Sequence, residues 1–411
     1  MKKDFLVNVI GLGYIGLPTA LMLSTHGINV VGTDYKKELV ASLSKGLLTF
    51  EENGVLELLC DSLKKGIKFS FEYQKADMYI VSVPTPYDKL TKKIDASFVV
   101  KAVEECLNIC DDEAILVIES TISPGTIDKY VRPLVSLSRK KINLCHAPER
   151  IIPGNMVYEL EHNSRTIGAD DKNIGEIVKE IYSSFCRGEI AITDIKTAEM
   201  TKVIENTFRA VNIAFANELL KLCYENNMNV YEIIKICNMH PRVNILNPGP
   251  GVGGHCIPVD PWFLVGDYPM ETKIIGQSMH INEKMPEFVI KQIKEIMVKE
   301  GITDTNKVGL YGLTYKENVD DIRESPTLQL LEFQKKHLGA PLKVYDPHIH
   351  KNVVENQYFD FDEFLSEIDL LVVMIAHSHL KENLDKIKSK IIFDTRNSIF
   401  CTPKLYKLGI K

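Results

Sequence analysis

A short apolar stretch followed at once by three spaced glycines constrains the fold of this chain more than any other feature. Residues 5–10 are typical of a buried parallel strand, and Gly11-Leu-Gly13-Tyr-Ile-Gly16 comes directly after them. A helical pattern and a second apolar run follow, and Asp34 stands at the end of that run. Strand, glycine loop, helix, strand and acid in this order predict the first βαβ unit of a dinucleotide-binding Rossmann domain.

Each residue of this motif has a physical role in binding a dinucleotide. Gly11 makes the tight turn, Gly13 lets a pyrophosphate approach the backbone, and Gly16 lets the helix pack closely on the strand. The N-terminus of the helix attracts the phosphates. Asp34 would bond a ribose 2′-hydroxyl and repel a 2′-phosphate, which favours NAD over NADP, although two neighbouring lysines keep NADP as an alternative. The other interpretation is a Rossmann-like domain that binds no ligand.

Two later apolar runs end in small hydroxyl side chains. Residues 78–83 lead into Thr85, and residues 115–118 lead into Thr121. Open α/β sheets bind ligands at the carboxyl ends of their strands, so Thr85 and Thr121 are candidate cofactor contacts. Both threonines are equally compatible with capping a loop or a helix.

A further predicted strand, residues 142–146, leads into Glu149 and Arg150. The same strand-end argument makes these two charged residues candidates for the site. The alternative is an exposed ion pair.

A long helical pattern without proline or glycine covers residues 196–225. Such a helix would be about 45 Å long. Glu199, Lys202, Asn206 and Arg209 are spaced three or four residues apart, so they lie along one stripe of the helix. A solvated face is the simpler interpretation of this stripe, but asparagine is a poor helix former, which suggests that Asn206 has another role.

A glycine-rich loop, residues 249–254, precedes a single cysteine, Cys256. Pro258 and Pro261 fit the first turn of a helix, so we expect Cys256 at a helix N-terminus, where the dipole favours the thiolate. Asp260 is four residues further on and would share a helix face with Cys256. The alternative is a structural turn with a buried thiol.

The last third of the chain repeats the pattern of the first. Residues 307–313 are a predicted strand, and Asp346 stands where Asp34 stands in the first unit. Gly309 and Gly312 do not reproduce the glycine motif, so this second doubly wound domain should bind a ligand other than NAD, such as another nucleotide. The cationic side chains near its predicted strand ends are Lys316, Arg323 and Arg396.

Composition narrows the class of protein. The chain has 411 residues and a net charge of −6, which argues against a general nucleic-acid binder. No apolar run is long enough to span a membrane, no signal peptide is visible, and nine scattered cysteines do not form a disulfide pattern, so we expect a cytoplasmic protein. The spacing of histidine and cysteine predicts no metal site.

The predicted fold is α/β, with two Rossmann-like doubly wound parallel-sheet domains joined by a long central helix. We assign residues 1–195 to NAD binding, residues 196–297 to a helical domain for dimerisation and catalysis, and residues 298–411 to the second nucleotide-type domain. The apolar faces of the middle segment suit association of two copies.

The motifs occur in an order that resembles the UDP-glucose/GDP-mannose dehydrogenase family. That order is G-x-G-x-x-G, Val-Pro-Thr-Pro, Glu-Ser-Thr, Pro-Glu-Arg, Ala-Glu-Met-Thr-Lys-x-x-Glu-Asn-Thr, Gly-Gly-His-Cys-x-x-x-Asp, Gly-Leu-Thr-Tyr-Lys and Asp-Asp-Ile-Arg-Glu-Ser-Pro. The resemblance covers essentially the whole chain. The segments His-Pro-Arg-Val-Asn and Pro-Glu-Arg-Ile-Ile-Pro-Gly are most similar to members that act on UDP-N-acetyl-D-mannosamine, whereas UDP-glucose dehydrogenases usually read Pro-Glu-Phe.

The resemblance implies a reaction. The C6 alcohol of a nucleotide sugar is oxidised twice to a carboxylate with two NAD⁺, and Cys256 forms a thiohemiacetal and then a thioester. Lys202 and Asn206 match residues that stabilise oxyanion charge, while Asp260, Thr121 and Glu149 match residues that order water and assist proton transfer.

The resemblance also implies the binding residues and a homodimer with shared sites. Arg242 matches an arginine that reaches the substrate of a neighbouring subunit. The implied cofactor contacts are Gly11, Gly13, Tyr14, Ile15, Gly16, Asp34, Thr85, Thr121 and Arg323. The implied UDP-sugar contacts are the loop from Asn247 to Gly254, which includes Gly253, together with Glu149, Arg150, Lys202, Asn206, Arg209, Arg242, Asn244, Lys316 and Arg396.

Three alternatives are left open by the sequence. The sugar nucleotide could be UDP-GlcNAc, UDP-glucose or GDP-mannose. A β-hydroxyacid dehydrogenase also joins a Rossmann domain to long helices, but it leaves Cys256 and the third domain unexplained. A nucleotide-sugar binding or sensing module with a degenerate site would keep the fold and lose turnover.

Overall fold

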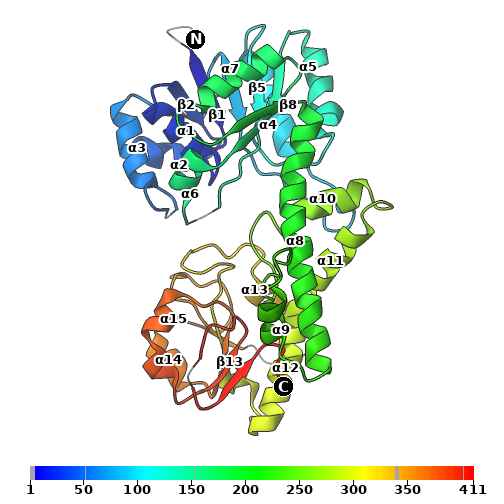
Figure 1. The fold of residues 1–411 in the computed structure, drawn as a ribbon. Helices are drawn as coiled ribbons and strands as arrows, with labels where there is room; N and C mark the ends of the chain where they lie inside the picture. Colours follow the sequence, from blue (N-terminus) through cyan, green and yellow to red (C-terminus); the bar gives the residue numbers. More distant parts are fainter. Residues whose placement is uncertain (1–4, 51, 153, 338–341, 401) are drawn as a thin grey trace. The chain divides into compact units, whose positions relative to one another are not determined.

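The computed structural model describes residues 5–50, 52–152, 154–337, 342–400 and 402–411. The chain forms two compact units. Unit 1 comprises Met1–Glu205 and Trp262–Tyr268, and unit 2 comprises Asn206–Pro261 and Pro269–Lys411. Figure 1 colours unit 1 mainly from blue to green and unit 2 mainly from green to red.

Unit 1 is built on an eight-stranded sheet. Its strands are β1 (Leu6–Ile10), β2 (Asn29–Thr33), β3 (Lys68–Ser70), β4 (Met78–Val81), β5 (Ile115–Ile118), β6 (Asn143–His146), β7 (Arg165–Ala169) and β8 (Ile190–Thr193). Their order in the sheet is β3-β2-β1-β4-β5-β6-β7-β8. The first six run parallel, β7 is antiparallel to β6, and β8 is parallel to β7. The first six strands therefore have the doubly wound order that the glycine motif predicted.

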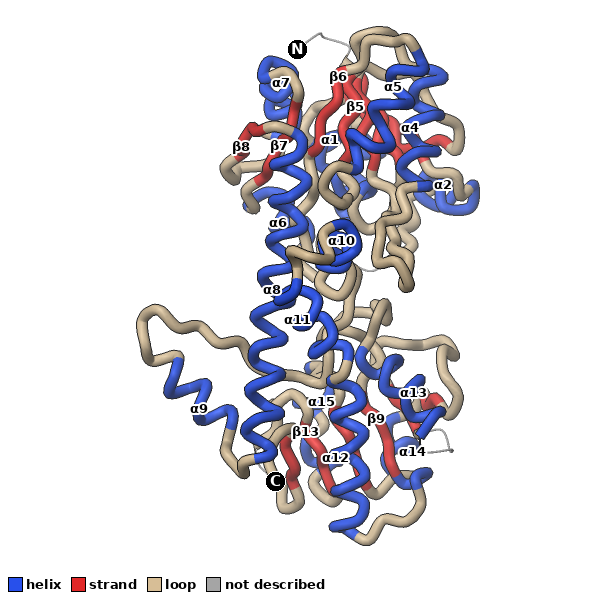
Figure 2. The backbone as a smooth tube through the Cα atoms, turned by 90° about the vertical axis from the view of Figure 1, so that its right-hand side faces the viewer, coloured by secondary structure: helices blue, strands red, loops and turns tan. Residues whose placement is uncertain are grey.

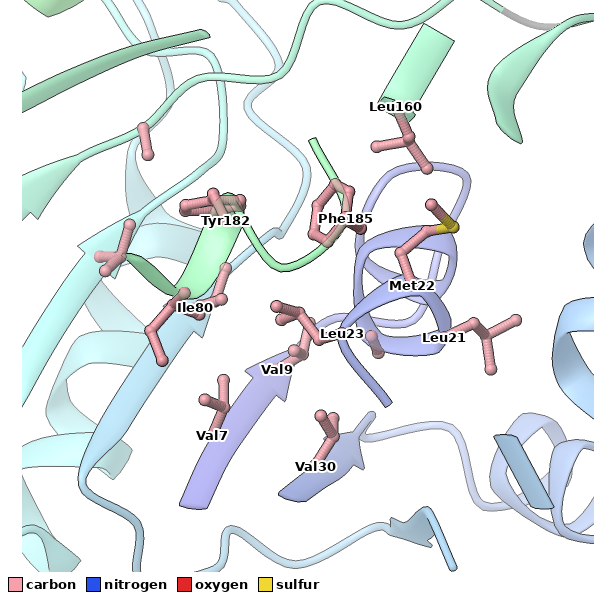
Figure 3. Packing of buried hydrophobic residues seen from close by; sticks show 14 of the residues in the cluster. Val7, Val9, Leu21, Met22, Leu23, Val30, Ile80, Leu160, Tyr182 and Phe185 are labelled. Carbon is pink, nitrogen blue, oxygen red and sulfur yellow. The ribbon is translucent and has the colours of Figure 1, made fainter. Parts of the chain in front are cut away.

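Alternating apolar side chains cover both faces of this sheet. Val7 and Val9 of β1 and Ile80 of β4 point to one core, whereas Ile10 and Tyr79 belong to the core on the opposite face. Successive strand residues point to opposite faces, and a parallel sheet is buried on both of them. Figure 3 shows Val7, Val9 and Ile80 packed with residues of α1 (Gly16–Thr25). This helix is buried along nearly its whole length, as its apolar sequence requires.

The remaining helices of unit 1 connect the strands. They are α2 (Lys37–Ser44), α3 (Val55–Lys64), α4 (Ser97–Ile109), the π-helical η1 (Ile127–Val131), α5 (Arg132–Ser138), α6 (Met156–His162) and α7 (Lys172–Tyr182). Two further helices begin in one unit and end in the other: α8 (Ile195–Glu225) and α10 (Asp260–Asp267). Figure 2 shows α8 as one continuous helix, which confirms the expectation for residues 196–225 within one residue.

Unit 2 is built on a second, six-stranded sheet that is parallel throughout. Its strands are β9 (Val308–Tyr311), β10 (Lys343–Tyr345), β11 (Gln357–Tyr358), β12 (Leu370–Val373), β13 (Ile391–Asp394) and β14 (Leu405–Lys407). Their order is β11-β10-β9-β12-β13-β14, which is the same winding as that of the first six strands of unit 1. The prediction of two Rossmann-like sheets is confirmed.

Unit 2 also contains helices of its own. They are α9 (Val230–Cys237), α11 (Lys273–Glu283), α12 (Met285–Glu300), the 3₁₀ helix η2 (Thr305–Lys307), α13 (Pro326–His337), α14 (Phe361–Ser366), α15 (Ser378–Glu382) and α16 (Leu384–Ile387). In the described part of the chain, no helix has both the length and the apolar character that crossing a membrane requires.

Replacing Leu21 with alanine should destabilise unit 1, because Leu21 is fully buried on α1. We expect a loss of about 2–5 kcal/mol in the free energy of unfolding, from lost apolar burial and the cavity that remains. Urea unfolding followed by the fluorescence of Trp262, the one tryptophan of the chain and a member of unit 1, measures this loss. The control is Leu137→Ala on α5, where the leucine is 78% exposed. Equal effects of the two substitutions would contradict the packing described.

Candidate active site

The glycine loop of unit 1 has the geometry of a dinucleotide cradle. Gly11 has a φ of +92°, and a Cβ at Gly11 would collide with the carbonyl oxygen of Ser82. A Cβ at Gly16 would collide with the carbonyl oxygen of Gly11. At Gly13 nothing lies within 4 Å of the place that a Cβ would take. The first two positions therefore need glycine for the fold, and the space beside Gly13 fits an approaching pyrophosphate.

Asp34 holds the same loop from the end of β2. Its Oδ2 accepts a hydrogen bond of 2.9 Å from the backbone nitrogen of Leu12, and its Oδ1 accepts one of 2.9 Å from the backbone nitrogen of Lys36. Tyr14 stacks on Phe50 with ring centroids 4.3 Å apart. The backbone of the loop is thus fixed where the phosphates and the ribose are expected.

The loops after β4 and β5 lie against each other. Thr85 Oγ1 donates to the carbonyl oxygen of Thr121 at 2.6 Å. Ser120 Oγ accepts from the backbone nitrogen of Val83 at 2.8 Å and donates to its carbonyl oxygen at 2.7 Å. Thr85 thus has the loop-capping role that was the alternative to a cofactor contact, and it also brings Thr121 to the same edge of the sheet.

Glu149 and Arg150 follow β6, but their side chains have separate partners. The carboxylate of Glu149 is buried, pairs with the guanidinium of Arg165, and accepts from the backbone nitrogen of Arg150 at 2.6 Å. Arg150 pairs with Glu205 at 2.5 Å and donates to the carbonyl oxygen of Ser164 at 2.8 Å. The expected alternative, an exposed pair between Glu149 and Arg150, is wrong, because buried Arg165 on β7 neutralises Glu149 instead.

The polar stripe on α8 divides into a buried and an exposed part. Glu199, Lys202 and Asn206 are at most 7% exposed, whereas Arg209 is exposed. The interpretation as a solvated face is therefore wrong for the first three residues. The carboxylate of Glu199 accepts from the backbone nitrogens of Gly125 (2.6 Å) and Ile127 (3.0 Å), so it anchors the segment that follows Thr121.

In unit 2, Asn206 and Asp260 meet across 54 positions of sequence. Asn206 Nδ2 donates to Asp260 Oδ2 at 2.6 Å, and both side chains are buried. The backbone nitrogen of Asp260 donates to the carbonyl oxygen of Cys256 at 2.8 Å, so the cysteine lies one turn before Asp260. The Cys256 side chain is exposed, which excludes the alternative of a buried thiol.

The helix start was predicted too early. The first residue of α10 is Asp260, and the turn that contains Cys256 and Pro258 precedes the helix. Pro261 does lie in the first helical turn, as expected. Pro258 lies in the preceding turn instead, because proline suits a tight turn as well as a first helical position, and the sequence does not distinguish the two.

The glycine-rich loop before Cys256 packs tightly within unit 2. A Cβ at Gly253 would lie 2.7 Å from the carbonyl oxygen of Glu324 and 2.7 Å from the Cβ of Tyr315. Gly254 has a φ of +94°, and its backbone nitrogen donates to the carbonyl oxygen of Arg323 at 2.9 Å. These glycines therefore let the loop approach the segment between β9 and α13.

The three cationic residues that the sequence singled out in the last third lie on segments next to this loop in unit 2. A Cβ at Gly249 would lie 3.1 Å from Nη1 of Arg396, and Lys316 is exposed next to Tyr315. Arg323 is fixed by Asp321 at 2.6 Å. The glycine-rich loop thus lies beside Arg396 at one end and against the segment that contains Tyr315 and Glu324 at the other.

Arg242 and Asn244 lie elsewhere in unit 2, on the loop after α9 that Figure 2 shows. Both side chains are exposed. Asn238 closes this loop, because its side chain donates to the carbonyl oxygen of Ile245 at 2.9 Å and accepts from its nitrogen at 2.7 Å. The loop is thus a defined structure that presents Arg242 to solvent.

A contact at Trp262 could not be predicted from any sequence pattern. In unit 1 the ammonium of Lys92 lies 3.9 Å from the centroid of the buried Trp262 ring, and a Cβ at Gly266 would collide with the Lys92 carbonyl. Lys92 has a φ of +60° in a hairpin that follows Thr85. This hairpin therefore fixes the part of α10 that belongs to unit 1.

Family models match nearly the whole chain. The NAD binding domain of the UDP-glucose/GDP-mannose dehydrogenase family matches residues 5–186, the central domain of that family matches residues 196–284, and its UDP binding domain matches residues 309–400. The chain belongs to the UDP-glucose/GDP-mannose dehydrogenase family. It is an NAD-dependent nucleotide-sugar dehydrogenase.

Individual relatives resemble the chain over nearly its full length. A UDP-N-acetyl-D-mannosamine dehydrogenase of Methanococcus maripaludis is 43% identical over 408 residues, which cover 95% of this chain and 92% of the relative. The native structure of the UDP-N-acetyl-mannosamine dehydrogenase Cap5O from Staphylococcus aureus is 39% identical, with a TM-score of 0.88 and 98% of each chain covered. The UDP-D-ManNAc dehydrogenase of Pyrococcus horikoshii is 34% identical, with a TM-score of 0.90, and covers 98% of this chain and 99% of its own.

Replacing Gly13 with alanine should weaken NAD⁺ binding without destabilising the fold. The added methyl group enters open space on the protein side but occupies the place expected for the pyrophosphate. We expect the KM for NAD⁺ to rise about tenfold or more at an unchanged melting temperature. The matched variant Gly16→Ala should instead lower the melting temperature, because its Cβ meets backbone. An unchanged KM in a folded Gly13→Ala protein would show that the cofactor binds elsewhere.

Proposed function

We propose that this chain is a UDP-N-acetyl-D-mannosamine 6-dehydrogenase that makes UDP-N-acetyl-D-mannosaminuronate with two NAD⁺. The observation that carries the proposal is the set formed in unit 2 by the exposed Cys256 thiol, Asp260 one turn later, and the Asn206 amide bonded to Asp260. The names of relatives at 40–43% identity support the choice of sugar. We place the reaction in the cytoplasm.

The three segments have separate tasks in this proposal. Residues 1–195 bind NAD⁺ through the Gly11–Gly16 motif, Asp34, Thr85 and Thr121, with Arg323 on the pyrophosphate side. Residues 196–297 carry the catalytic groups and the dimer contacts, and residues 298–411 bind the UDP group. When bound, NAD⁺ accepts the hydride that leaves C6 of the sugar in each of two oxidations.

Cys256 carries the covalent chemistry between those oxidations. Its thiolate adds to the carbon of the C6 aldehyde, a carbon–sulfur bond forms, and the carbonyl oxygen becomes an oxyanion. The ammonium of Lys202 and the amide of Asn206 stabilise that oxyanion. After the second oxidation the carbon is a thioester. Water then adds to the thioester carbon and the carbon–sulfur bond breaks. This step releases the sugar carboxylate and regenerates the Cys256 thiolate.

Asp260, Thr121 and Glu149 order the attacking water and move protons. Burial of Asp260 against Asn206 fixes its carboxylate one turn from the thiol, which supports this role. The diphosphate of the substrate binds to the glycine-rich loop at Gly253 and to the cationic side chains of Arg396 and Lys316. The further substrate contacts are Glu149, Arg150, Lys202, Asn206, Arg209, Arg242 and Asn244.

The proposal includes a homodimer. Phe208, Phe215 and Leu222 of α8 follow one another at intervals of seven residues and are 54–68% exposed. A spacing of seven keeps apolar side chains on one side of a helix, which is typical of a helix that packs against a partner. A second copy of this chain covers that stripe, and Arg242 reaches the substrate of the neighbouring subunit.

The purified protein should release two NADH for each UDP-N-acetyl-D-mannosamine consumed. Cys256→Ala should stop the second oxidation and lower the yield of carboxylate by about 100-fold or more, because the covalent route is lost. NADH absorbance and mass spectrometry of the products measure both quantities. The control is Cys237→Ala, which removes another exposed cysteine.

The same assay on UDP-GlcNAc, UDP-glucose and GDP-mannose decides the sugar. We expect the highest kcat/KM for UDP-N-acetyl-D-mannosamine. A higher value for another sugar nucleotide would replace the proposed substrate and keep the mechanism.

Normal carboxylate yield at a normal rate in Cys256→Ala would contradict the role of the thiol. Binding without turnover would favour the sensing module.

Replacing Phe215 with glutamate should convert the dimer into monomers, because a charge in an apolar interface is costly to desolvate. Size-exclusion chromatography with light scattering measures the mass. The control Leu90→Glu changes a leucine that is 92% exposed on the hairpin after β4 and should leave the dimer intact. A monomeric wild-type protein, or a Phe215→Glu variant that remains dimeric, would disprove the proposed interface.

A further inference from the structure

Five buried polar side chains of unit 1 form a continuous chain beneath the cofactor loops. Thr19 Oγ1 on α1 donates to Glu119 Oε1 at 3.2 Å, and Tyr182 OH at the end of α7 donates to the same oxygen at 3.1 Å. The guanidinium of Arg165 on β7 lies 4.6 Å from the centroid of the Tyr182 ring. Nη2 of Arg165 pairs with Oε2 of Glu149. The chain thus leads from the helix that follows the glycine motif to a catalytic candidate.

The surroundings of this chain are apolar. All five side chains are at most 6% exposed. Figure 3 shows Tyr182 and Phe185 among the packed apolar residues of the core, and Arg165 lies 5.2 Å from the centroid of the Phe185 ring. Among the described residues, Nη1 of Arg165 is buried with no hydrogen-bond partner. Water therefore does not screen the charges held here.

The charges do not balance if both acids are ionised. One guanidinium faces two carboxyl groups, and the other titratable groups that face them are the phenol of Tyr182 and, beside Arg165, the thiol of Cys186. A second buried negative charge without a partner is strongly unfavourable. Burial and the negative charge of Glu149 raise the pKa of Glu119 to about 7, and Arg165 only partly opposes this.

Glu119 has a position that links it to function. It directly follows β5 and lies two residues before Thr121, whose carbonyl oxygen accepts from Thr85. Through Thr19 it also contacts the helix that begins at Gly16. Apolar side chains of similar volume would stabilise such a core at least as well as a buried ion pair does. Stability alone therefore does not explain two acids and an arginine at this place.

We propose that Arg165 is the positioning residue of Glu149, and that Glu119 holds a proton beside this pair, so that the protonation of Glu119 governs how firmly Arg165 holds Glu149. The proposal rests on the catalytic role proposed for Glu149. With Glu119 neutral, Arg165 pairs with Glu149 alone. When Glu119 loses its proton, two carboxylates compete for one guanidinium, and Arg165 holds Glu149 less firmly.

Glu119→Gln tests the proposal, because glutamine keeps an oxygen that accepts from Thr19 and Tyr182 but does not titrate in this range. The wild-type dehydrogenase should show a one-proton step near pH 7 in the pH profile of kcat. Glu119→Gln should lose this step. A purely structural role would change the melting temperature and leave the profile as it is, and that result would overturn the proposal.

Two readouts do not need turnover and therefore separate this proposal from the proposed function. Infrared difference spectra of the wild-type protein between pH 6 and pH 8 should contain the band of protonated Glu119, which Glu119→Gln should lack. Burial also raises the pKa of Glu199 to about 7, so the band of Glu199 should remain in both proteins. Because the pKa of Glu119 is higher in the folded than in the unfolded chain, this group should make the wild-type protein lose stability as the pH rises towards about 7. Glu119→Gln should show a smaller loss, because Glu199 still contributes to it. A spectrum and a pH-dependent stability loss that are the same in Glu119→Gln as in the wild-type protein would overturn the proposal even if the enzyme oxidises no sugar nucleotide.

Arg165→Lys tests the positioning role. Lysine keeps the charge but not the planar group that pairs with Glu149, so we expect kcat to fall about tenfold or more with little change in the KM for NAD⁺. The matched control is Arg132→Lys, because Arg132 forms an exposed pair with Asp170 in the same unit and should tolerate the exchange. Wild-type kcat in Arg165→Lys, or equal losses in both variants, would contradict the assignment.

Discussion

A carboxylate at the end of the second strand fixes the first loop of each sheet. Asp34 accepts a hydrogen bond from the backbone of Leu12 in unit 1, and Asp346 accepts one of 2.6 Å from the backbone of Leu313 in unit 2. A strand end leaves backbone groups that need partners, and a buried aspartate supplies them. The two sheets share this arrangement although only the first has the full glycine motif. Gly312, with a φ of +100°, makes the turn in the second.

Buried charged and polar groups determine where the catalytic candidates lie. Arg165 neutralises Glu149, and Asn206 bonds to Asp260. An unpartnered charge in these surroundings would be too unfavourable to persist, so each candidate is held in one orientation by its partner. Catalysis by preorganised groups depends on such fixed orientations, because the groups do not have to reorganise during the reaction. Cys256, by contrast, is exposed, as a group that must form a bond to the substrate requires.

Much of the fold and part of the site could be predicted from local patterns. The strand–glycine–helix unit around Gly11, the length of α8 and the repeated winding of the last third all agree with the structure. The first residue of α10 was placed too early, because Pro258 and Pro261 suit a turn and a helix start equally. Arg165 and Glu119 were missed as partners of the site. Arg165 pairs with Glu149, 16 positions away, and Glu119 accepts from Tyr182, 63 positions away, and nothing in the sequence around these residues points to such pairs.

The sequence by itself determined the elements and the class of chemistry, because strand and helix periodicity, glycine turns and motif order are local properties of the chain. Only the tertiary structure decided which side chains meet. Glu149 pairs with Arg165 and not with its neighbour Arg150, and Glu199 anchors the segment after Thr121 although it shares a helix stripe with Lys202. The physical reason is that burial forces every charge to find the partner that packing brings within reach, and packing joins strands and helices that lie far apart in the sequence.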